Sequence, residues 1–466
     1  MNSPLSEVRT LRFLGAADTV TGSKFLLTQS DHSLLIDCGL FQGTKEVRLR
    51  NWERPPVEAA TLKGVVLTHA HLDHSGYLPA LFRGGYRGQV FATEGTHSLC
   101  RILLPDSGHL QEEEADYANR KGYSKHTPAL PLYTEEEAWK SLEHFSSIAS
   151  GKAFDIGPFR VTLRHAGHIL GASSALVQLG GRRRILFSGD LGRPFHPLLR
   201  TPEPPPDAEV MVLESTYGDR IHDDQGALSA FAEAIERTVG RGGVVIIPSF
   251  AVDRTEVVLF YLRRLQLEGQ IPRLPVYVDS PMALAALRLY QNAIVSADPD
   301  MKPDVVGKPE ILKPDQLIEV KTVDDSISLN ARSGPMVIIS ASGMATGGRV
   351  LHHLANRLPD KRNTVILVGY QAEGTRGRSL LDGAPSVKML GRYVPVAADI
   401  VNIPAFSVHA DQSEIIRWLK TAASTPEVVY LVHGDHTAAK TLRQKITMEL
   451  GWNVVVPHHL ERVRLD

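Results

Sequence analysis

Residues Thr68 to Gly76 read THAHLDHSG, and this segment restricts the fold more than any other part of the sequence. Three histidines and one aspartate occupy the six positions from His69 to His74, directly behind the apolar run Val65 to Leu67. Their spacing fits no single face of a helix, on which neighbours are three or four residues apart. The pattern therefore predicts a loop that leaves a buried strand and can bind two metal ions.

Imidazole and carboxylate groups together suit zinc, and they also bind manganese and iron. The affinity order among divalent metals does not choose the ion, so zinc is our expectation, with manganese or iron as alternatives. The competing interpretation is a polar loop that is merely rich in histidine. Four potential ligands within six residues favour a metal site over such a loop.

Three later segments offer further ligands, each behind a short β-rich run. His165 ends the run FRVTLRH, and His168 follows it. Asp190 follows RILF, and His433 follows VVYLV. Several strands that end at one edge of a sheet sandwich would deliver such side chains to one place. Each segment alone is weak evidence, because a single histidine after a strand is more often an ordinary interior or surface residue. The combination of segments carries the prediction.

Together with LLIDCG at residues 34–39, these segments resemble the ordered motifs of the metallo-β-lactamase fold family. ESTYGD at 214–219, FSVHAD at 406–411 and LVHGD at 431–435 resemble the three additional motifs of the β-CASP nucleases. That group includes the cleavage subunit of the messenger RNA 3′-end processing complex. The resemblance covers nearly the whole chain and implies an α/β protein, in which an αββα metallo-β-lactamase sandwich carries an inserted β-CASP domain.

The order of predicted elements agrees with a split domain. We expect residues 1–212 and 397–466, which contain short strands, turns and the ligand segments, to form the two parts of the metallo-β-lactamase domain. Residues 213–396 alternate helical patterns with apolar runs such as VVIIP, PVYVD and MVIIS. Strands that alternate with helices indicate a mainly parallel sheet flanked by helices, which we assign to the β-CASP domain.

The resemblance also implies a ligand set for two zinc ions. One ion would be bound by three histidines, the second by an aspartate and two histidines, and one aspartate would bridge them: His69, His71 and His168; Asp73, His74 and His433; Asp190. Asp37 would accept a hydrogen bond from a ligand imidazole or from nearby backbone and so fix the ring orientation. The alternative for Asp37 is a structural aspartate that caps a turn.

Two cations of this kind convert a bridging water into hydroxide near neutral pH, which can attack a phosphodiester. The leaving alkoxide needs a proton. The resemblance implies that His409 donates this proton, that Glu214 orients or charges His409, and that the products carry a 5′-phosphate and a 3′-hydroxyl. From the residues alone, Glu214 could equally begin a capped turn after a strand, and His409 could be an ordinary residue ahead of a helix.

Glycine-rich and arginine-rich segments suggest how RNA phosphates are held. SASGMATGGR at 340–349 offers small residues whose backbone N–H groups can approach an anion, ahead of a predicted helix in VLHHLANRL. GTRGR at 374–378 is predicted to be a flexible loop, and arginine can bind phosphate in bidentate fashion. The alternative is a plain loop before a helix. The candidate RNA contacts are Ser340, Ser342, Gly343, Arg349, Arg254, Arg376 and Arg378.

Composition and charge limit the class of protein. The 466 residues, of which 43% are hydrophobic, are sufficient for two or three domains with a sizeable core. Cys38 and Cys100 give no disulfide framework and fit a reducing cytoplasm. No apolar run is long enough to span a bilayer, and the amino terminus lacks a secretory signal. We therefore expect a cytoplasmic protein, monomeric or homodimeric, with no membrane partner.

These observations predict a dinuclear zinc endoribonuclease that hydrolyses single-stranded RNA, with exonuclease activity as an addition. A net charge of −1 is compatible with RNA, because a local arginine-lined groove can attract phosphates. DNA-processing relatives usually lack histidine at the last motif, so His433 favours RNA over DNA. The chain resembles the short bacterial-type form, without an extra RNA-binding module.

Two other classes stay open. One is another hydrolase of the same fold, such as a thioesterase or lactonase, because THAHLDH alone does not identify the ester. The inserted domain, the arginine segments and His409 disfavour it. The other is a non-catalytic RNA-binding subunit, a role found among relatives with eroded metal motifs. The complete set of ligands disfavours this second class.

Overall fold

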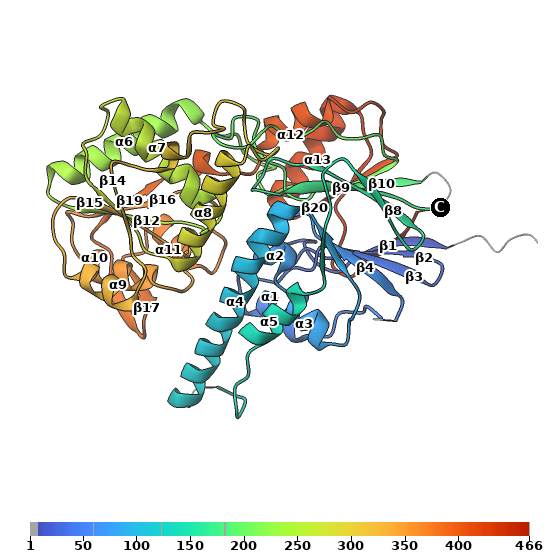
Figure 1. Cartoon of the computed structure of the whole chain (residues 1–466), viewed down its shortest axis with the longest axis horizontal. Helices are drawn as coiled ribbons and strands as arrows, with labels where there is room; N and C mark the ends of the chain where they lie inside the picture. Colours follow the sequence, from blue (N-terminus) through green and yellow to red (C-terminus); the bar gives the residue numbers. More distant parts are fainter. Residues whose placement is uncertain (1–7, 59, 123, 181–182, 466) are drawn as a thin grey trace, which may run out of the picture. The chain divides into compact units, whose positions relative to one another are not determined.

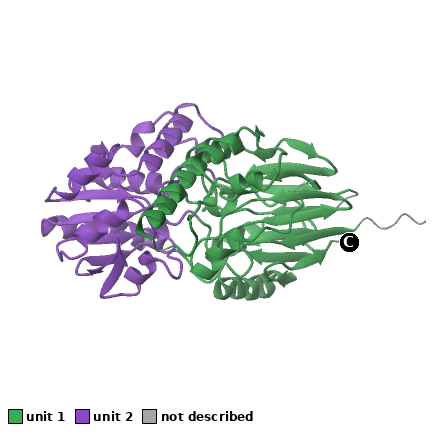
Figure 2. Ribbon diagram, turned by 90° about the horizontal axis from the view of Figure 1, so that it is seen from below, with its two compact units in different colours: residues 1–196, 201–221, 409–466 green, residues 197–200, 222–408 purple. Residues whose placement is uncertain are grey.

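The computed structural model describes residues 8–58, 60–122, 124–180 and 183–465. The described residues form two compact units (Figure 2): unit 1 falls within 1–196, 201–221 and 409–466, and unit 2 comprises 197–200 and 222–408. Unit 1 is therefore discontinuous in sequence, and unit 2 is inserted into it. The compact units divide the chain at 221/222 and 408/409. The domain boundaries at 212/213 and 396/397 stay a prediction.

Two seven-stranded sheets form the centre of unit 1. The first sheet has the order β22 (Arg462–Arg464), β1 (Arg9–Phe13), β2 (Phe25–Gln29), β3 (His32–Ile36), β4 (Leu62–Val66), β5 (Val90–Ala92) and β6 (Phe145–Ser147). The second has the order β21 (Val454–Val455), β20 (Val428–Val432), β11 (Val210–Glu214), β10 (Arg184–Phe187), β9 (Ser173–Gln178), β8 (Phe159–His165) and β7 (Ala153–Ile156). Both sheets contain parallel and antiparallel pairs.

The two sheets pack face to face through large apolar side chains. Phe13 and Phe25 of the first sheet belong to one buried cluster with Phe187 and Tyr430 of the second. The ring centroids of Phe13 and Tyr430 lie 5.1 Å apart, and those of Phe25 and Phe187 lie 5.7 Å apart. Burial of this apolar surface drives the association of the sheets, and tilted ring pairs add to it. The core thereby fixes the ends of the strands relative to one another.

Helices cover the outer faces of both sheets (Figure 1). The helices on the side of the first sheet are α1 (Lys45–Leu49), η1 (Arg50–Trp52), α2 (Leu72–Ser75), α3 (Leu78–Arg83), α4 (Glu94–Lys121) and α5 (Glu135–Leu142). Those on the side of the second sheet are α12 (Gln412–Leu419) and α13 (His436–Leu450). Leu442 and Ile446 of α13 share a buried cluster with Leu213 and Leu431 of the second sheet. The predicted αββα sandwich is therefore confirmed. Of the described helices, none is both long and apolar enough to cross a bilayer.

A six-stranded parallel sheet forms the centre of unit 2. Its order is β14 (Gln316–Glu319), β13 (Pro275–Val278), β15 (Met336–Ser340), β12 (Val244–Pro248), β16 (Thr364–Leu367) and β19 (Asp399–Asn402). All neighbouring pairs are parallel. β12 and β15 are buried at every position, as expected where helices cover both faces of a sheet. The predicted parallel sheet is thus confirmed.

The remaining elements of unit 2 surround this sheet. They are α6 (Asp224–Gly240), α7 (Arg254–Leu267), α8 (Pro281–Val295), η2 (Pro309–Leu312), α9 (Val323–Asn330), α10 (Val350–Arg357), α11 (Arg376–Leu381), η3 (Pro404–Phe406) and the antiparallel hairpin of β17 (Ser386–Met389) and β18 (Arg392–Pro395). In Figure 1, α6 and α7 lie on one face of the sheet, and α9 and α10 lie on the other.

The segment GTRGR differs from its prediction as a flexible loop. Arg376 and Arg378 lie on helix α11, and the Thr375 hydroxyl accepts a hydrogen bond from the Arg378 N–H at the start of this helix. Gly377 is tightly packed, because a Cβ atom there would lie 1.8 Å from Gln371 Oε1. The glycine therefore serves a close approach within the fold, and the prediction of a flexible loop was wrong.

Candidate metal centre

Three imidazoles and one carboxylate converge in unit 1 at the carboxyl ends of three strands. His69 and His71 follow β4, His168 follows β8, and Asp190 follows β10. His71 Nδ1 lies 3.2 Å from both His69 Nε2 and His168 Nε2. Asp190 Oδ2 lies 3.4 Å from His69 Nε2 and 3.6 Å from His168 Nε2. Nitrogen and oxygen donors thus face a common point, as the ligands of a metal ion do.

A second group of donors lies on the other side of Asp190. Asp73 and His74 belong to α2, a one-turn helix, and His433 follows β20. His433 Nε2 lies 3.2 Å from Asp73 Oδ2, and His74 Nε2 lies 3.3 Å from Asp190 Oδ1. The sequence predicted a loop for all of THAHLDH. Only the part up to His71 is non-helical. The helical turn that follows brings Asp73 and His74 to the same side as the preceding loop.

Asp190 connects the two groups through its two carboxylate oxygens. Oδ2 faces His69 and His168, whereas Oδ1 faces His74. The side chain is 2% exposed, and Oδ1 accepts no hydrogen bond from any residue that the structure describes. A buried carboxylate oxygen without such a partner is costly unless a cation lies beside it. The donor set therefore fits two metal ions that share Asp190, and its imidazole and carboxylate chemistry suits zinc.

Unusual backbone conformations occur where the site is built. Asp37 and His433 each follow directly behind a strand and have positive φ angles of 58° and 51°. Gly39 also packs closely against the metal loop, because a Cβ atom there would lie 1.6 Å from the backbone oxygen of Asp73. Left-handed conformations are costly for residues other than glycine, and they concentrate at functional sites. LLIDCG thus supplies a sharp turn that receives the loop of metal ligands.

Asp37 lies beside the ligands without facing their common points. Its Oδ2 lies 2.8 Å from His74 Nδ1, and its Oδ1 accepts a 2.7 Å hydrogen bond from the Thr68 N–H. The Thr68 hydroxyl also contacts this carboxylate and lies 3.1 Å from His69 Nδ1. These contacts leave the Nε2 atoms of both imidazoles directed at Asp190. Such outer partners orient ligand rings and raise their basicity.

Two threonines in this arrangement were missed by the sequence analysis. Thr68 holds His69 as described above, and the Thr216 hydroxyl lies 3.0 Å from His433 Nδ1 and donates a 3.0 Å hydrogen bond to the His433 backbone oxygen. Both residues are present in the quoted motifs THAHLDH and ESTYGD. Thr68 directly precedes His69, and Thr216 lies two residues after Glu214, which could have drawn attention to both. They were overlooked because threonine is not itself a usual metal ligand in such motifs. His165, by contrast, was considered as a metal ligand in the sequence, but it belongs to neither group of donors in the structure.

Burial and mutual charge set the protonation of the centre. Burial lowers the pKa of His69, and the neighbouring His74 lowers it further. Burial also opposes charge on His74, but the carboxylates of Asp190 and Asp37 outweigh it and raise the pKa of His74 well above its usual value. The pKa of Asp190 is held well below its usual value despite burial, because His433 and His74 attract its negative charge. An ion that binds His74 would compete with a proton for this imidazole.

His409 and Glu214 meet beside the first group of donors. His409 Nδ1 lies 3.2 Å from Glu214 Oε2 and 3.8 Å from Asp190 Oδ2. Glu214 ends β11, is 1% exposed, and accepts a hydrogen bond from the Leu191 N–H through Oε1. His409 is 15% exposed, so its ring is the more accessible of the pair. A fixed, buried carboxylate thus orients a partly accessible imidazole next to the donors.

The candidate RNA contacts all belong to unit 2. Ser340 and Arg349 take part in a network around Asp279, whose buried carboxylate lies at the end of β13. This carboxylate accepts hydrogen bonds from Ser326 Oγ at 2.5 Å and Arg349 Nη1 at 2.8 Å, and it lies 2.6 Å from His353 Nε2. The Ser340 hydroxyl donates to the Asp279 backbone oxygen at 2.8 Å. The network joins β13, β15, α9 and α10, and the RNA contacts of Ser340 and Arg349 stay a prediction.

The other candidates are also bonded within unit 2. Ser342 Oγ accepts a 3.0 Å hydrogen bond from the Thr346 N–H, and the Gly343 carbonyl accepts one from Gln371 Nε2 at 3.2 Å. Arg254, the first residue of α7, is 5% exposed. Arg376 Nε donates to the Lys388 backbone oxygen at 2.8 Å, and Arg378 Nε donates to Asp382 at 2.9 Å. Their RNA contacts are likewise untested.

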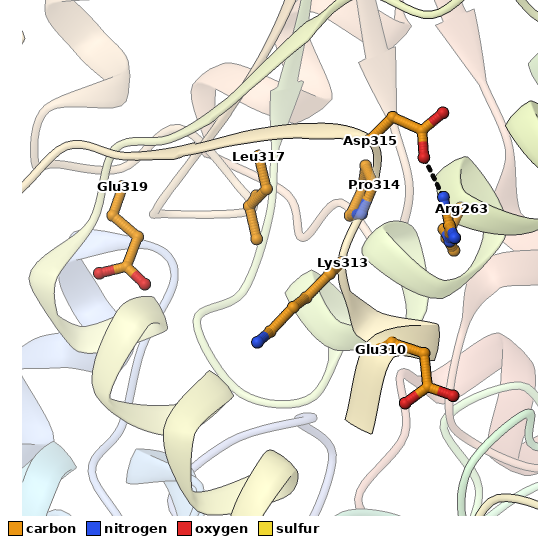
Figure 3. Close-up of a pocket in the computed structure, with 7 residues that line it drawn as sticks. All are labelled: Arg263, Glu310, Lys313, Pro314, Asp315, Leu317 and Glu319. Atoms are coloured by element: carbon orange, nitrogen blue, oxygen red, sulfur yellow. Dashed lines mark hydrogen bonds and ion pairs between the residues drawn. The ribbon is translucent and has the colours of Figure 1, made fainter. Parts of the chain in front are cut away.

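An open pocket in unit 2 is separate from all of these residues (Figure 3). Its lining is Arg263, Glu310, Lys313, Pro314, Asp315, Leu317 and Glu319. Asp315 pairs with Arg263 and with Arg273 at 2.9 Å, and Glu319 pairs with Arg288 at 3.2 Å. The acidic groups are thus largely neutralised by basic side chains. The pocket lining contains none of the predicted site residues.

Comparisons with known proteins agree with this geometry. Residues 18–85 match the metallo-β-lactamase superfamily, residues 255–380 match the β-CASP domain, and residues 393–457 match the Zn-dependent metallo-hydrolase RNA specificity domain. A crystal structure of a protein of unknown function from Enterococcus faecalis V583 has a TM-score of 0.53, covers 98% of this chain and 100% of its own, and is 15% identical. This last similarity shows the fold alone.

Curated relatives match over most of their length. Ribonuclease TTHA0252 of Thermus thermophilus is 37% identical over 423 residues, which are 90% of this chain and 92% of the relative. The transcription termination factor FttA of Methanocaldococcus jannaschii is 30% identical over 468 residues, which are 97% of this chain and 71% of the relative. The matches to these relatives extend over both units, and the three domain families match successive parts of the chain. The chain therefore belongs to the β-CASP nucleases of the metallo-β-lactamase superfamily.

Proposed function

We propose that this protein is a dinuclear zinc endoribonuclease that cuts single-stranded RNA and leaves a 5′-phosphate and a 3′-hydroxyl. Membership of the β-CASP nucleases supports metal-dependent hydrolysis of RNA, and the related Thermus thermophilus protein is a ribonuclease. The observation that carries the proposal is the pair of donor groups that share Asp190, with His409 3.8 Å from the same carboxylate.

The ligand residues would act first by binding. His69, His71 and His168 would hold one ion, Asp73, His74 and His433 the other, and Asp190 both. When bound, the two ions would activate the attacking water and neutralise charge on the phosphoryl oxygens. Asp37 accepts a hydrogen bond from the His74 ring and would thereby hold this imidazole in the orientation for metal binding. Burial of this centre strengthens the electrostatic interactions on which such a reaction depends.

His409 would act as the general acid. A ribose oxygen leaves poorly as an alkoxide, so a proton must reach the 3′ oxygen as the phosphorus–oxygen bond breaks. Glu214 accepts from Nδ1 of His409, which leaves Nε2 as the atom that would carry and donate this proton. The donation would restore a neutral imidazole, which solvent can protonate again because the side chain is 15% exposed.

Cleavage assays on purified protein would test the proposal. With zinc or manganese present, we expect internal cuts in a labelled single-stranded RNA, products with 5′-phosphates, and slower cutting of duplex RNA and of DNA of the same sequence. A parallel assay would offer a lactone and a thioester. Rapid hydrolysis of either ester with the RNA left intact would contradict the proposal and favour another hydrolase of this fold.

A further inference from the structure

The hairpin of β17 and β18 presents an aromatic ring and basic groups on an exposed surface of unit 2. Tyr393 is 71% exposed, although tyrosine is usually at least half-buried in a folded protein. Lys388 is exposed directly across the hairpin from Tyr393, since the two residues are register partners. Directly opposite residues share one face and have Cβ atoms about 4.5–5.5 Å apart. An ammonium group thus lies within reach of whatever covers the tyrosine ring.

Charge on the hairpin has a single sign. Residues 385–396 read PSVKMLGRYVPV and contain two basic side chains, Lys388 and Arg392, and no acidic one. Arg392 is exposed at the turn and precedes Tyr393 in the chain. Neither Lys388 nor Arg392 has an ion pair with any residue that the structure describes. The surface is complementary to a polyanion that also carries planar rings.

The opposite face of the hairpin anchors it to the unit. Val387, Met389 and Val394 are at most 5% exposed and belong to the same buried cluster as Val350 and Leu354 of α10. Alternation along the strands therefore separates an inner apolar face from an outer face with Lys388 and Tyr393. Because the inner face accounts for the packing, the exposed tyrosine and lysine are not needed to hold the hairpin in place.

Arg376 fixes the hairpin relative to the glycine-rich segment at 340–349. Its Nε donates to the Lys388 backbone oxygen at 2.8 Å, and its Nη1 donates to the backbone oxygens of Ala345 at 3.2 Å and Thr346 at 2.9 Å. One guanidinium thus joins three carbonyls from two segments. The predicted phosphate-binding segment and the hairpin surface are therefore held in a constant relation within unit 2.

We propose that the outer face of this hairpin is a second contact site for single-stranded RNA, at which a base stacks on Tyr393 and Lys388 binds an adjacent phosphate. The inference rests on the proposed function, since it names a further part of the same substrate's binding surface. Aromatic rings beside cations are how proteins bind single strands without reading a sequence. The match to the Zn-dependent metallo-hydrolase RNA specificity domain begins at residue 393, in β18.

Equilibrium binding of a fluorescent 20-nucleotide polyuridine would test the site, in full-length protein that carries Asp190→Ala so that the RNA stays intact. Tyr393→Ala should weaken binding about 5- to 150-fold, the range found for loss of one stacked base. Tyr393→Phe should bind as the parent does, because it keeps the ring. The matched control is Tyr117→Ala, which removes a 50% exposed tyrosine from α4 and should leave affinity unchanged.

Salt dependence would test the phosphate contacts separately. Lys388→Glu should weaken binding and reduce the slope of log affinity against log salt by about 0.7, the value for one phosphate contact on a single strand. Lys361→Glu changes the charge of another exposed lysine of unit 2 and should leave the slope unchanged. All variants should keep the parent's thermal unfolding midpoint, because the altered side chains are exposed.

The outcomes separate this inference from the proposed function. Equal affinity of Tyr393→Ala and the parent, or equal loss in Tyr393→Ala and Tyr393→Phe, would overturn the stacking site. Loss of self-association in Tyr393→Ala, measured by sedimentation with RNA affinity intact, would overturn it in favour of an interface between two copies of the chain. If wild-type protein neither binds nor cuts RNA, the proposed function itself fails.

Discussion

Both units place polar residues behind the carboxyl ends of buried strands, but the carboxylates there differ in how fully they are hydrogen-bonded. In unit 1, donors from β4, β8, β10 and β20 converge, and Asp190 Oδ1 accepts no hydrogen bond from the described residues. In unit 2, the comparable Asp279 behind β13 accepts bonds from Ser326 and Arg349 and lies beside His353. Asp190 keeps one carboxylate oxygen that fits a cation, whereas the carboxylate of Asp279 is satisfied by the chain itself.

This difference separates a reactive centre from a structural one. A buried charge that is paired and hydrogen-bonded contributes to the conformation of its surroundings, whereas imidazole nitrogens and carboxylate oxygens that converge on one point favour a cation. The same order of elements, a buried strand followed by small and polar residues, therefore serves two purposes in one chain. Substitutions at equivalent places in the two units should consequently differ in what they change.

The largest effect is expected for Asp190→Ala in unit 1. Loss of the shared carboxylate should reduce the rate of RNA cleavage by about 1,000-fold or more, because the bound metals supply several kcal/mol of transition-state stabilisation. The measurement is single-turnover cleavage at saturating zinc. Asp31→Ala, which removes an 84% exposed aspartate, is the control and should cut as fast as wild type. Cleavage by Asp190→Ala at the wild-type rate would contradict the assignment.

His409→Ala should have the next largest effect on activity. Removal of the proton donor should slow turnover about 100- to 10,000-fold, the usual range for general acid–base catalysis. The variant should still bind the same number of ions as wild type, because His409 Nδ1 contacts Glu214 instead of completing a donor group. Metal analysis and cleavage of the same preparation would measure both properties. Full activity in this variant would remove His409 from the acid role.

Asp279→Ala provides the contrast in unit 2. It would leave His353 and Arg349 without their shared carboxylate, which should lower the free energy of unfolding by about 3–5 kcal/mol, the usual cost of breaking a buried ion pair. Denaturation in urea would measure the loss, and metal content per folded chain should stay the same. A fall in metal content without a loss of stability would reverse the contrast between the two units.

Asp37→Ala should have a smaller effect, because Asp37 acts on the metal through His74. We expect zinc affinity to fall about 10- to 100-fold, the usual consequence of removing such an outer partner. Competition with a chelating dye would measure the change, and excess zinc should restore most of the cleavage rate. If affinity does not change, the alternative interpretation of Asp37 as a residue that only caps a turn gains support.

The smallest effect is expected for Arg378→Ala on stability. Arg378 pairs with Asp382 one helical turn later, and both side chains are more than 40% exposed. Exposed pairs of this kind contribute about 0–1 kcal/mol, so the unfolding midpoint in urea should hardly move. RNA binding by the same variant shows whether Arg378 also contacts phosphate. A large loss of stability would mean that α11 depends on this pair.

The candidate metal centre was largely accessible from the sequence, because its nitrogen and oxygen donors are chemically distinctive and all seven fall in short motifs behind recognisable strands. The αββα sandwich was implied by the resemblance to the metallo-β-lactamase fold family, and the parallel sheet followed from the alternation of apolar runs with helical patterns. What the sequence did not show was the one-turn helix α2 and the support from Thr68 and Thr216. A single helical turn has too few residues for a periodic pattern, and threonine is common in many local roles.

The exposed and short elements of unit 2 were less accessible. β14 and α9 have several solvent-facing positions, and the β17–β18 strands are only four residues each, so apolar periodicity is weak there. Glycine and arginine in GTRGR suggested a flexible loop, yet Gly377 permits close packing against Gln371. Tyr393 and Lys388 are separated by four residues and become neighbours only through the hairpin register. Tertiary pairing of this kind leaves little trace in a linear sequence.

Calorimetric titration of zinc into metal-free protein counts the ions that the two donor groups bind with their shared carboxylate. We predict two equivalents of zinc for wild-type protein and fewer for Asp190→Ala, with proton release on binding because the pKa of His74 is raised in the metal-free state. A single equivalent in fully folded wild-type protein would contradict the account.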